Sequence, residues 1–146
     1  MEIRIITSGK RKRAVARAVL TEGTGKVTIN KRGHKTLQNF DMLKIEEPIR
    51  IAEHVLGKKN FDVAINVRGG GEKGQIEAAR LALARAILEF SKSNAKIKSS
   101  EKSEDKELEK EYQNYDWSLL TADVRRKEAY KPGDSKARAK RQKSFR

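Results

Sequence analysis

Hydrophobic and polar residues alternate over several short stretches of the chain, and this period of two is typical of half-buried β-strands. It is clearest over residues 61–68, "FDVAINVR", where every second side chain is apolar and bulky. Residues 14–22 carry small alanines on one face, which would let a helix pack closely against that strand. Shorter strands are predicted over 2–6 and 26–30. The glycines of 23–25 are expected to form a hairpin between the strands at 14–22 and 26–30.

Two longer stretches have the apolar spacing of amphipathic helices. Residues 47–57, "EPIRIAEHVLG", predict a helix with Pro48 at its first position. Residues 74–92, "GQIEAARLALARAILEFSK", predict the strongest helix, because alanine and leucine favour helix intrinsically. Arg80 is expected to face water there. Residues 34–45 predict no more than a short helical turn. The mixture of strands and helices indicates a two-layer α/β (α+β) body.

Charge divides the chain of 146 residues, whose formal net charge is +14, into regions. Residues 1–90 carry 18 basic and 10 acidic side chains and form the expected body. Residues 91–114 carry six of each and read as a charged, low-complexity insert, either a solvated helix or a disordered linker. Residues 115–124 are predicted to dock onto the body or onto a partner. Residues 125–146 carry ten bases and two acids and predict an extended tail.

The docking prediction depends on four apolar side chains, and the tail prediction depends on having almost none. The residues expected to dock are Tyr115, Trp117, Leu119 and Leu120. From Tyr130 onward the sequence has no apolar period, so the tail is not expected to fold without a partner. Tyr130 and Phe145 could stack on nucleic-acid bases.

The excess of positive charge points to a polyanionic partner, either nucleic acid or an anionic membrane surface. The chain has no cysteine, which excludes disulfides and thiolate zinc sites. It has no apolar run of the roughly 18 residues that a membrane span needs. We therefore expect a soluble, intracellular protein without a membrane partner.

Catalytic chemistry finds little support in the sequence. The glycine-rich stretch "RGGGEKGQ" at 68–75 lacks the Ser or Thr that follows Gly-Lys in a phosphate-binding loop and holds magnesium. A plain turn and a contact with an RNA backbone both remain open for it. His34 and His54 stand apart from other ligands, and no nucleophile, base and orienting group can be assembled. The sequence predicts no enzyme, cofactor, metal or small-molecule substrate.

Binding chemistry is better supported, because cations cluster at both ends of the chain. The first cluster is Lys10, Arg11, Lys12 and Arg13. It can be read as a solvated charge cluster, a nuclear-import signal or a set of phosphate contacts. In the tail, cations alternate with alanine, which keeps the chain slim enough to enter gaps between RNA helices. Counterions released from the phosphates would drive that binding.

Four segments together resemble one protein family. They are "GKRKRAVARAVLTEGTGKVTIN", "VRGGGEKGQIEAARLALARAI", "YDWSLLTADVRRKE" and "ARAKRQKSFR". This set is similar to the S-nine family of small-subunit ribosomal proteins in its archaeal and eukaryotic style. The resemblance covers about 8–90 and 115–146, and 91–114 departs from it, since the family usually has a shorter join there. The rival classes are a small-molecule kinase of the same fold and a free-standing nucleic-acid or chromatin binder.

The resemblance implies a fold, a location and a set of contacts. The fold would be like the second domain of the ribosomal protein S-five, a mixed sheet with two main helices and a left-handed βαβ crossover. The protein would sit on the cytoplasmic ribosome, in the head of the small subunit, beside neighbouring head proteins. The residues implied to bind ribosomal RNA are Lys10, Arg11, Lys12, Arg13, Arg68, Gly69, Gly70, Gly71, Arg125, Arg126, Lys127, Arg138, Lys140 and Arg141. Those implied to contact the anticodon stem-loop of P-site tRNA are Lys143, Ser144, Phe145 and Arg146.

Overall fold

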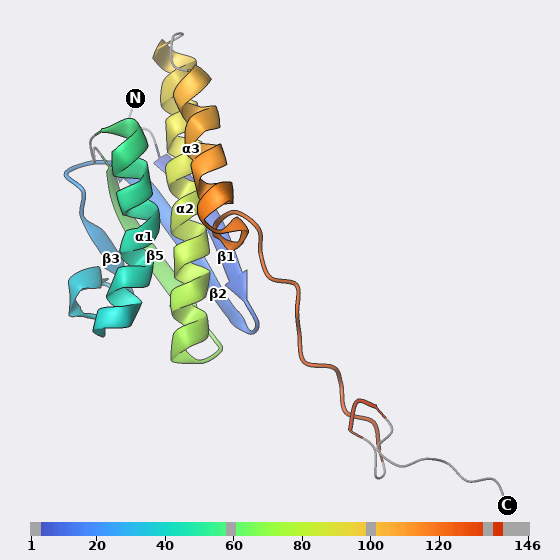
Figure 1. The fold of residues 1–146 in the computed structure, drawn as a ribbon. Coiled ribbons are helices and arrows are strands. Elements are labelled where there is room, and N and C mark those ends of the chain that lie inside the picture. Colours follow the sequence, from blue (N-terminus) through green and yellow to red (C-terminus); the bar gives the residue numbers. More distant parts are fainter. Residues whose placement is uncertain (1–3, 58–60, 99–101, 133–135, 139–146) are drawn as a thin grey trace, which may run out of the picture.

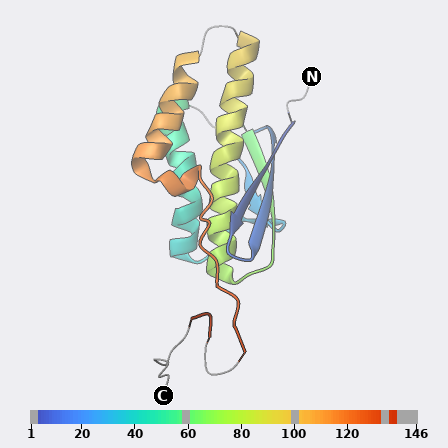
Figure 2. The same ribbon diagram turned by 90° about the vertical axis from the view of Figure 1, so that its right-hand side faces the viewer.

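The protein is a two-layer α/β structure, described here from a computed structural model covering residues 4–57, 61–98, 102–132 and 136–138. A five-stranded mixed sheet carries its helices on one face only (Figures 1 and 2). The strands are β1 (Arg4–Arg11), β2 (Ala14–Glu22), β3 (Val27–Ile29), β4 (Arg32–Gly33) and β5 (Phe61–Arg68). The helices are α1 (Asn39–Leu56), α2 (Glu72–Lys98) and α3 (Lys102–Tyr115), with short 3-10 turns η1 (His34–Thr36) and η2 (Trp117–Leu119).

The order of strands in the sheet is β1-β2-β5-β3-β4. β1 and β2 form an antiparallel hairpin, β5 pairs antiparallel with β2, and β3 pairs parallel with β5. The predicted hairpin between 14–22 and 26–30 is therefore wrong, because β5 lies between these strands. α1 connects β3 to β5, so β3-α1-β5 is a crossover between parallel neighbours; its left-handedness stays a prediction.

A carboxylate, rather than a hairpin turn, fixes the connection between β2 and β3. Asp62 Oδ1 accepts hydrogen bonds from the backbone N–H groups of Thr24 and Lys26, both at 2.8 Å. The bond from Lys26 is the strongest of the effects that hold the pKa of Asp62 below its usual range. A Cβ at Gly23 would lie 2.2 Å from the Asp62 carboxyl carbon, so a side chain there would have to displace the carboxylate that holds this connection.

The core lies between the sheet and α2, and the predicted faces are confirmed. Phe61, Val63, Ile65 and Val67 are all buried, as are the alanines of β2. These small side chains let α2 lie close to the sheet, and β1 comes closer still at Gly9. Beside it the Thr7 hydroxyl donates to the Ala82 carbonyl at 2.7 Å. The hydroxyl thereby gains a partner inside the core.

α1 begins nine residues before Pro48, so the prediction that Pro48 opens the helix is wrong. The true first turn is held by Asp41, whose buried carboxylate receives the Lys73 ammonium at 2.9 Å. A proline inside a helix lacks the N–H for one hydrogen bond. Here Pro48 is buried, and its carbonyl accepts a hydrogen bond from the Tyr112 hydroxyl at 2.7 Å.

The described parts of the segment 91–114, residues 91–98 and 102–114, are helical, and their composition does not reveal how closely they pack. α2 continues to Lys98, and α3 returns beside it and contacts both α1 and α2. Leu108 and Tyr112 are completely buried, and the Ser91 hydroxyl donates to the buried carboxylate of Asp105. Burial raises the pKa of the Tyr112 phenol far above its usual value. The described part of the insert is therefore helical and not a disordered linker. It is not fully solvated, because one face of α3 belongs to the core.

Among the described residues, no helix is both long enough and apolar enough to cross a bilayer.

Candidate nucleic-acid interface

Three cationic or glycine-rich segments, far apart in sequence, meet at one end of the domain. They are the β1–β2 turn at 12–13, the loop 69–71 between β5 and α2, and the start of the tail at 125–127. The guanidinium of Arg126 donates to the Lys12 carbonyl at 2.6 Å and joins the tail to the turn. We call this region the cationic end. It lies at the lower end of the molecule in Figures 1 and 2, where the tail leaves the body.

The glycines of the loop are needed for its geometry. Gly69 and Gly70 have positive φ angles of 73° and 69°. A Cβ at Gly69 would lie 2.7 Å from the Arg13 carbonyl oxygen, and one at Gly70 would lie 2.9 Å from the Ala14 nitrogen. Gly71 faces open space, since nothing lies within 4 Å of its Cβ position. The plain-turn interpretation thus explains two glycines, and the third leaves backbone exposed beside the first turn of α2.

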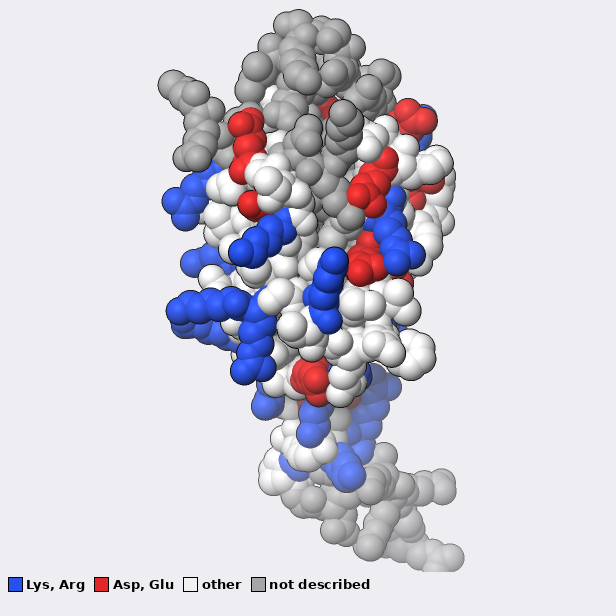
Figure 3. Space-filling model, turned by 90° about the vertical axis from the view of Figure 1, so that its left-hand side faces the viewer, with Lys and Arg blue, Asp and Glu red and all other residues white. Residues whose placement is uncertain are grey.

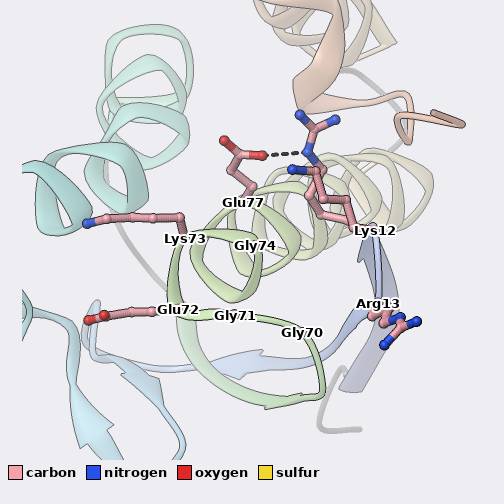
Figure 4. A pocket seen from close by; sticks show the side chains of 9 residues that line it. Lys12, Arg13, Gly70, Gly71, Glu72, Lys73, Gly74 and Glu77 are labelled. Atoms are coloured by element: carbon pink, nitrogen blue, oxygen red, sulfur yellow. Dashed lines mark ion pairs between the residues drawn. The ribbon is translucent and has the colours of Figure 1, made fainter. Parts of the chain in front are cut away.

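A cavity of about 510 Å³ is lined jointly by this loop, the β1–β2 turn and the start of α2 (Figure 4). Its lining carries both signs of charge, with Lys12, Arg13 and Lys73 as cations and Glu72 and Glu77 as acids. Figure 4 shows Arg13 pointing away from α2, and Lys12 and Arg13 are both exposed.

The four cations of 10–13 do not have the same surroundings. Arg11 is three-quarters buried, and it pairs with Glu77 at 2.6 Å and with Asp123. Its charge therefore holds the docking segment to α2 and is less available to phosphate than those of Lys12 and Arg13. Lys10 is exposed and, like Arg68, lies on the sheet face that no helix covers.

Two of the four apolar side chains of the docking segment, residues 115–124, pack onto the body. Leu119 is completely buried and Leu120 partly so, but Tyr115 and Trp117 are 57% and 61% exposed. Polar contacts do the rest of the docking: the Arg85 guanidinium donates to the carbonyls of Leu120 and Ser8 at 3.0 and 2.9 Å. The exposed rings of Tyr115 and Trp117 form apolar surface at the C-terminal end of α3.

Arg80 does not face water as predicted. Its side chain is 14% exposed and pairs with Glu47 at 2.7 Å and Asp116 at 2.9 Å. Burial opposes ionisation of Asp116, but hydrogen bonds from Ser118 and Arg80 outweigh it and lower the pKa of this carboxyl. This ion-pair network joins α1, α2 and η2, and so fixes the start of the docking segment on the body.

The described part of the tail is extended and carries its own contacts. The Lys127 ammonium lies 4.2 Å from the centre of the Tyr130 ring, which is 61% exposed. Arg138 donates to Glu128 at 2.8 Å, and this bond lowers the pKa of Glu128. Such an exposed pair is weak and can exchange for a phosphate contact. Lys140, Arg141, Lys143, Ser144, Phe145 and Arg146 lie outside the described residues.

Metal-binding and catalytic geometry is not seen in the part of the chain that the structure describes. No group of three or more His, Asp or Glu side chains there could hold a metal ion. His34 is used locally, with Nδ1 3.1 Å from the Val27 carbonyl and Nε2 3.8 Å from Glu46. The fold and the cationic end together define a small, basic α/β protein with a surface suited to binding a polyanion.

Comparison with known proteins identifies the family. Residues 9–146 match the family described as "Ribosomal protein S9/S16". A relative from Methanococcus vannielii is 41% identical, and the alignment covers 96% of both chains. Relatives from Thermoplasma volcanium and Picrophilus torridus are 44% and 46% identical, with 97% of this chain covered. All three are named "Small ribosomal subunit protein uS9". The chain belongs to the ribosomal protein S9/S16 family.

Membership confirms the family predicted from the sequence and, with it, the class of a structural, non-enzymatic ribosomal protein of the cytoplasm. The alignments span 96% to 98% of each relative. The departure of residues 91–114 from the family stays a prediction. In this chain the segment packs against the body, since its Leu108 and Tyr112 are buried.

Proposed function

We propose that the chain is a structural component of the small ribosomal subunit, that its cationic end binds ribosomal RNA in the subunit head, and that its tail reaches P-site tRNA. The observation that carries the proposal is the convergence at the cationic end. The β1–β2 turn, the glycine-rich loop and the tail start come from three parts of the sequence, yet they present exposed cations and backbone N–H groups together. A phosphate backbone is recognised by this combination.

Within the cationic end, the exposed residues take distinct roles. Lys12, Arg13, Arg126 and Lys127 supply charges, and arginine can bridge two phosphate oxygens. Gly71 leaves the backbone open at the start of α2, where the helix dipole favours an anion. Most of these contacts position the protein on RNA and do not read its sequence.

For the tail, the support is its charge and its point of departure. Six cations and no acid occupy residues 136–146. The start of the tail is held to the body by the ion pair of Asp123 with Arg11 and by the hydrogen bond from Arg126 to the Lys12 carbonyl, so the tail extends from a defined place. The proposed tRNA ligands are Lys143, Ser144, Phe145 and Arg146.

The RNA part of the proposal predicts the effect of neutralising the β1–β2 turn. Lys12→Gln with Arg13→Gln should lower affinity for a small-subunit ribosomal RNA transcript on the order of tenfold. The slope of log affinity against log salt should fall by about two, one for each phosphate that the variant no longer neutralises. Filter binding over a salt series measures both. The control is Lys106→Gln with Lys110→Gln, two exposed cations of α3; equal behaviour of the two variants would contradict the proposal.

The tail part predicts the effect of removing residues 143–146. Subunits should assemble normally but release P-site tRNA faster, on the order of tenfold, because the terminal cations no longer hold the tRNA phosphates. Dissociation of labelled tRNA from reconstituted subunits measures this. Replacing the same four residues with Gly and Ser tests charge separately from length. A tRNA dissociation rate unchanged in both variants would refute the tail role and leave the RNA part intact.

A further inference from the structure

The helices cover one face of the sheet, and no described helix covers the opposite face, which we call the open face. On β1, β2 and β5 every second side chain is exposed or partly exposed, which is the burial pattern of a sheet packed on one side only. The strand residues of this open face are Arg4, Ile6, Ser8 and Lys10 on β1, Val15, Arg17, Val19 and Thr21 on β2, Thr28 on β3, and Asp62, Ala64, Asn66 and Arg68 on β5.

The pairing of the strands arranges these side chains in rows across the face. Next to the cationic end, Val15 lies between Lys10 and Arg68. One row further on, Arg17 lies between Ser8 and Asn66, two uncharged hydrogen-bonding groups. The last row begins with Arg4, opposite Thr21 and then Asp62.

The charge of the open face is strongly positive. It carries four cations, Arg4, Lys10, Arg17 and Arg68. Among the described strand residues of this face, Asp62 is the only acid, and its Oδ1 is engaged by the backbone of the β2–β3 connection. Between the cations lie small polar side chains and the apolar Ile6, Val15 and Val19, and none of them is as long as an arginine or a lysine, so a bulky polymer can come close to the sheet. In Figure 3, Lys and Arg side chains follow the left-hand edge and the lower end of the molecule.

The size of the face suits a nucleic-acid backbone. Arg4 and Lys10 are six residues apart on one strand, which corresponds to about 20 Å. Phosphates of a duplex strand recur about every 3.4 Å along the axis, so this distance covers several of them. A hollow of about 430 Å³ lies at the far end of the face, bordered by Arg4, Lys26 and Thr28. The other end is continuous with the cationic end through Lys10 and Arg68.

We propose that the open face of the sheet is a second RNA-binding surface, on which Arg17 and Arg4 contact phosphates of a structured ribosomal RNA segment that continues from the cationic end. The proposal rests on the proposed ribosomal function but not on the tail role. Ser8 and Asn66 flank Arg17 and supply neutral hydrogen bonds to sugar or phosphate oxygens. The sheet thus binds RNA by charge and shape rather than through stacked aromatic rings.

The test uses the full chain with Arg4→Gln and Arg17→Gln together. Both side chains are exposed, so the variant should keep its helical circular dichroism and its Tm. Affinity for the small-subunit ribosomal RNA transcript should fall about tenfold, and the salt slope by about two. Hydroxyl-radical footprinting should show protections that are absent with this variant and present with the Lys12/Arg13 variant. The Lys106/Lys110 variant is again the matched control.

Each outcome decides between the proposals. If the Arg4/Arg17 variant binds like the control while the Lys12/Arg13 variant is weakened, the open-face inference is refuted and the proposed function stands. If neither variant weakens binding, the RNA part of the proposed function fails as well. If RNA affinity is unchanged but incorporation into reconstituted subunits falls, the open face contacts a neighbouring protein, and the inference is overturned.

Discussion

Replacing Gly9 with alanine is expected to destabilise the protein by about 3 kcal/mol, the upper end of the usual cost of overpacking a core. The reason is that β1 contacts α2 at this residue with no space for a side chain. A Cβ at Gly9 would lie 2.2 Å from the Ala78 carbonyl oxygen and 2.7 Å from the Ala82 nitrogen. Both are backbone atoms, so the strand and the helix must separate. Thermal unfolding should show a Tm lower by roughly 10 °C.

Gly33→Ala is the matched control for this prediction. Nothing lies within 4 Å of a Cβ at Gly33, and its φ of −62° suits any residue. Its free energy of unfolding should change by no more than about 0.5 kcal/mol. If the Gly9→Ala and Gly33→Ala variants have the same Tm, β1 and α2 are not in close contact at Gly9.

Replacing Tyr112 with alanine is expected to cost about 3 to 5 kcal/mol, because the ring is completely buried where α3 meets α1. Tyr112→Phe should cost about 1 kcal/mol, since it removes only the hydrogen bond to the Pro48 carbonyl. Urea unfolding of the full chain measures both changes. The larger loss of stability should be accompanied by protease cleavage within α3.

The matched control on the same helix is Lys106→Ala, at an exposed position. Its stability should change by no more than about 0.5 kcal/mol. A destabilisation below about 1 kcal/mol for Tyr112→Ala would show that α3 is an accessory helix and not part of the core.

Periodicity is a good guide wherever one face of an element is buried along its whole length. The strand at 61–68 and the apolar stripe of α2 are such elements, and local spacing alone predicts both. It also predicts the short strand β3, but not its neighbour in the sheet. The pairing of β3 with β5 depends on a side-chain carboxylate 36 residues away from Lys26, and local patterns do not contain that information.

The errors in the helices have a similar origin. Pro48 is a good helix-starting residue, and nothing next to it reveals that Asp41 and Lys73 stabilise an earlier turn. In 91–114 the average composition is highly charged, yet Leu108 and Tyr112 are four residues apart and lie on one face of a helix. That pair is the available signal for a packed helix, and averaging over the segment conceals it.

For the candidate site, the sequence predicts which segments take part, but only the structure shows how they are arranged. The turn at 12–13, the glycine loop and 125–127 are each singled out by composition. Their meeting at one end depends on the β1–β2 hairpin, the β5–α2 connection and the path of the chain after α3. The separate role of Arg11 depends on Glu77 and Asp123, which are distant in sequence.

The antiparallel arrangement of α2 and α3 separates the ends of these helices from the place where the tail leaves the body, so the two regions can vary independently in evolution. The C-terminal end of α2 and the N-terminal end of α3 lie at the end of the molecule farthest from the exit of the tail (Figure 1). Whole helical turns inserted or deleted there would lengthen or shorten both helices together. The anchorage by Arg80 and Arg85 would stay where it is. The length of α2 and α3 can therefore change between lineages without changing where the tail leaves the body.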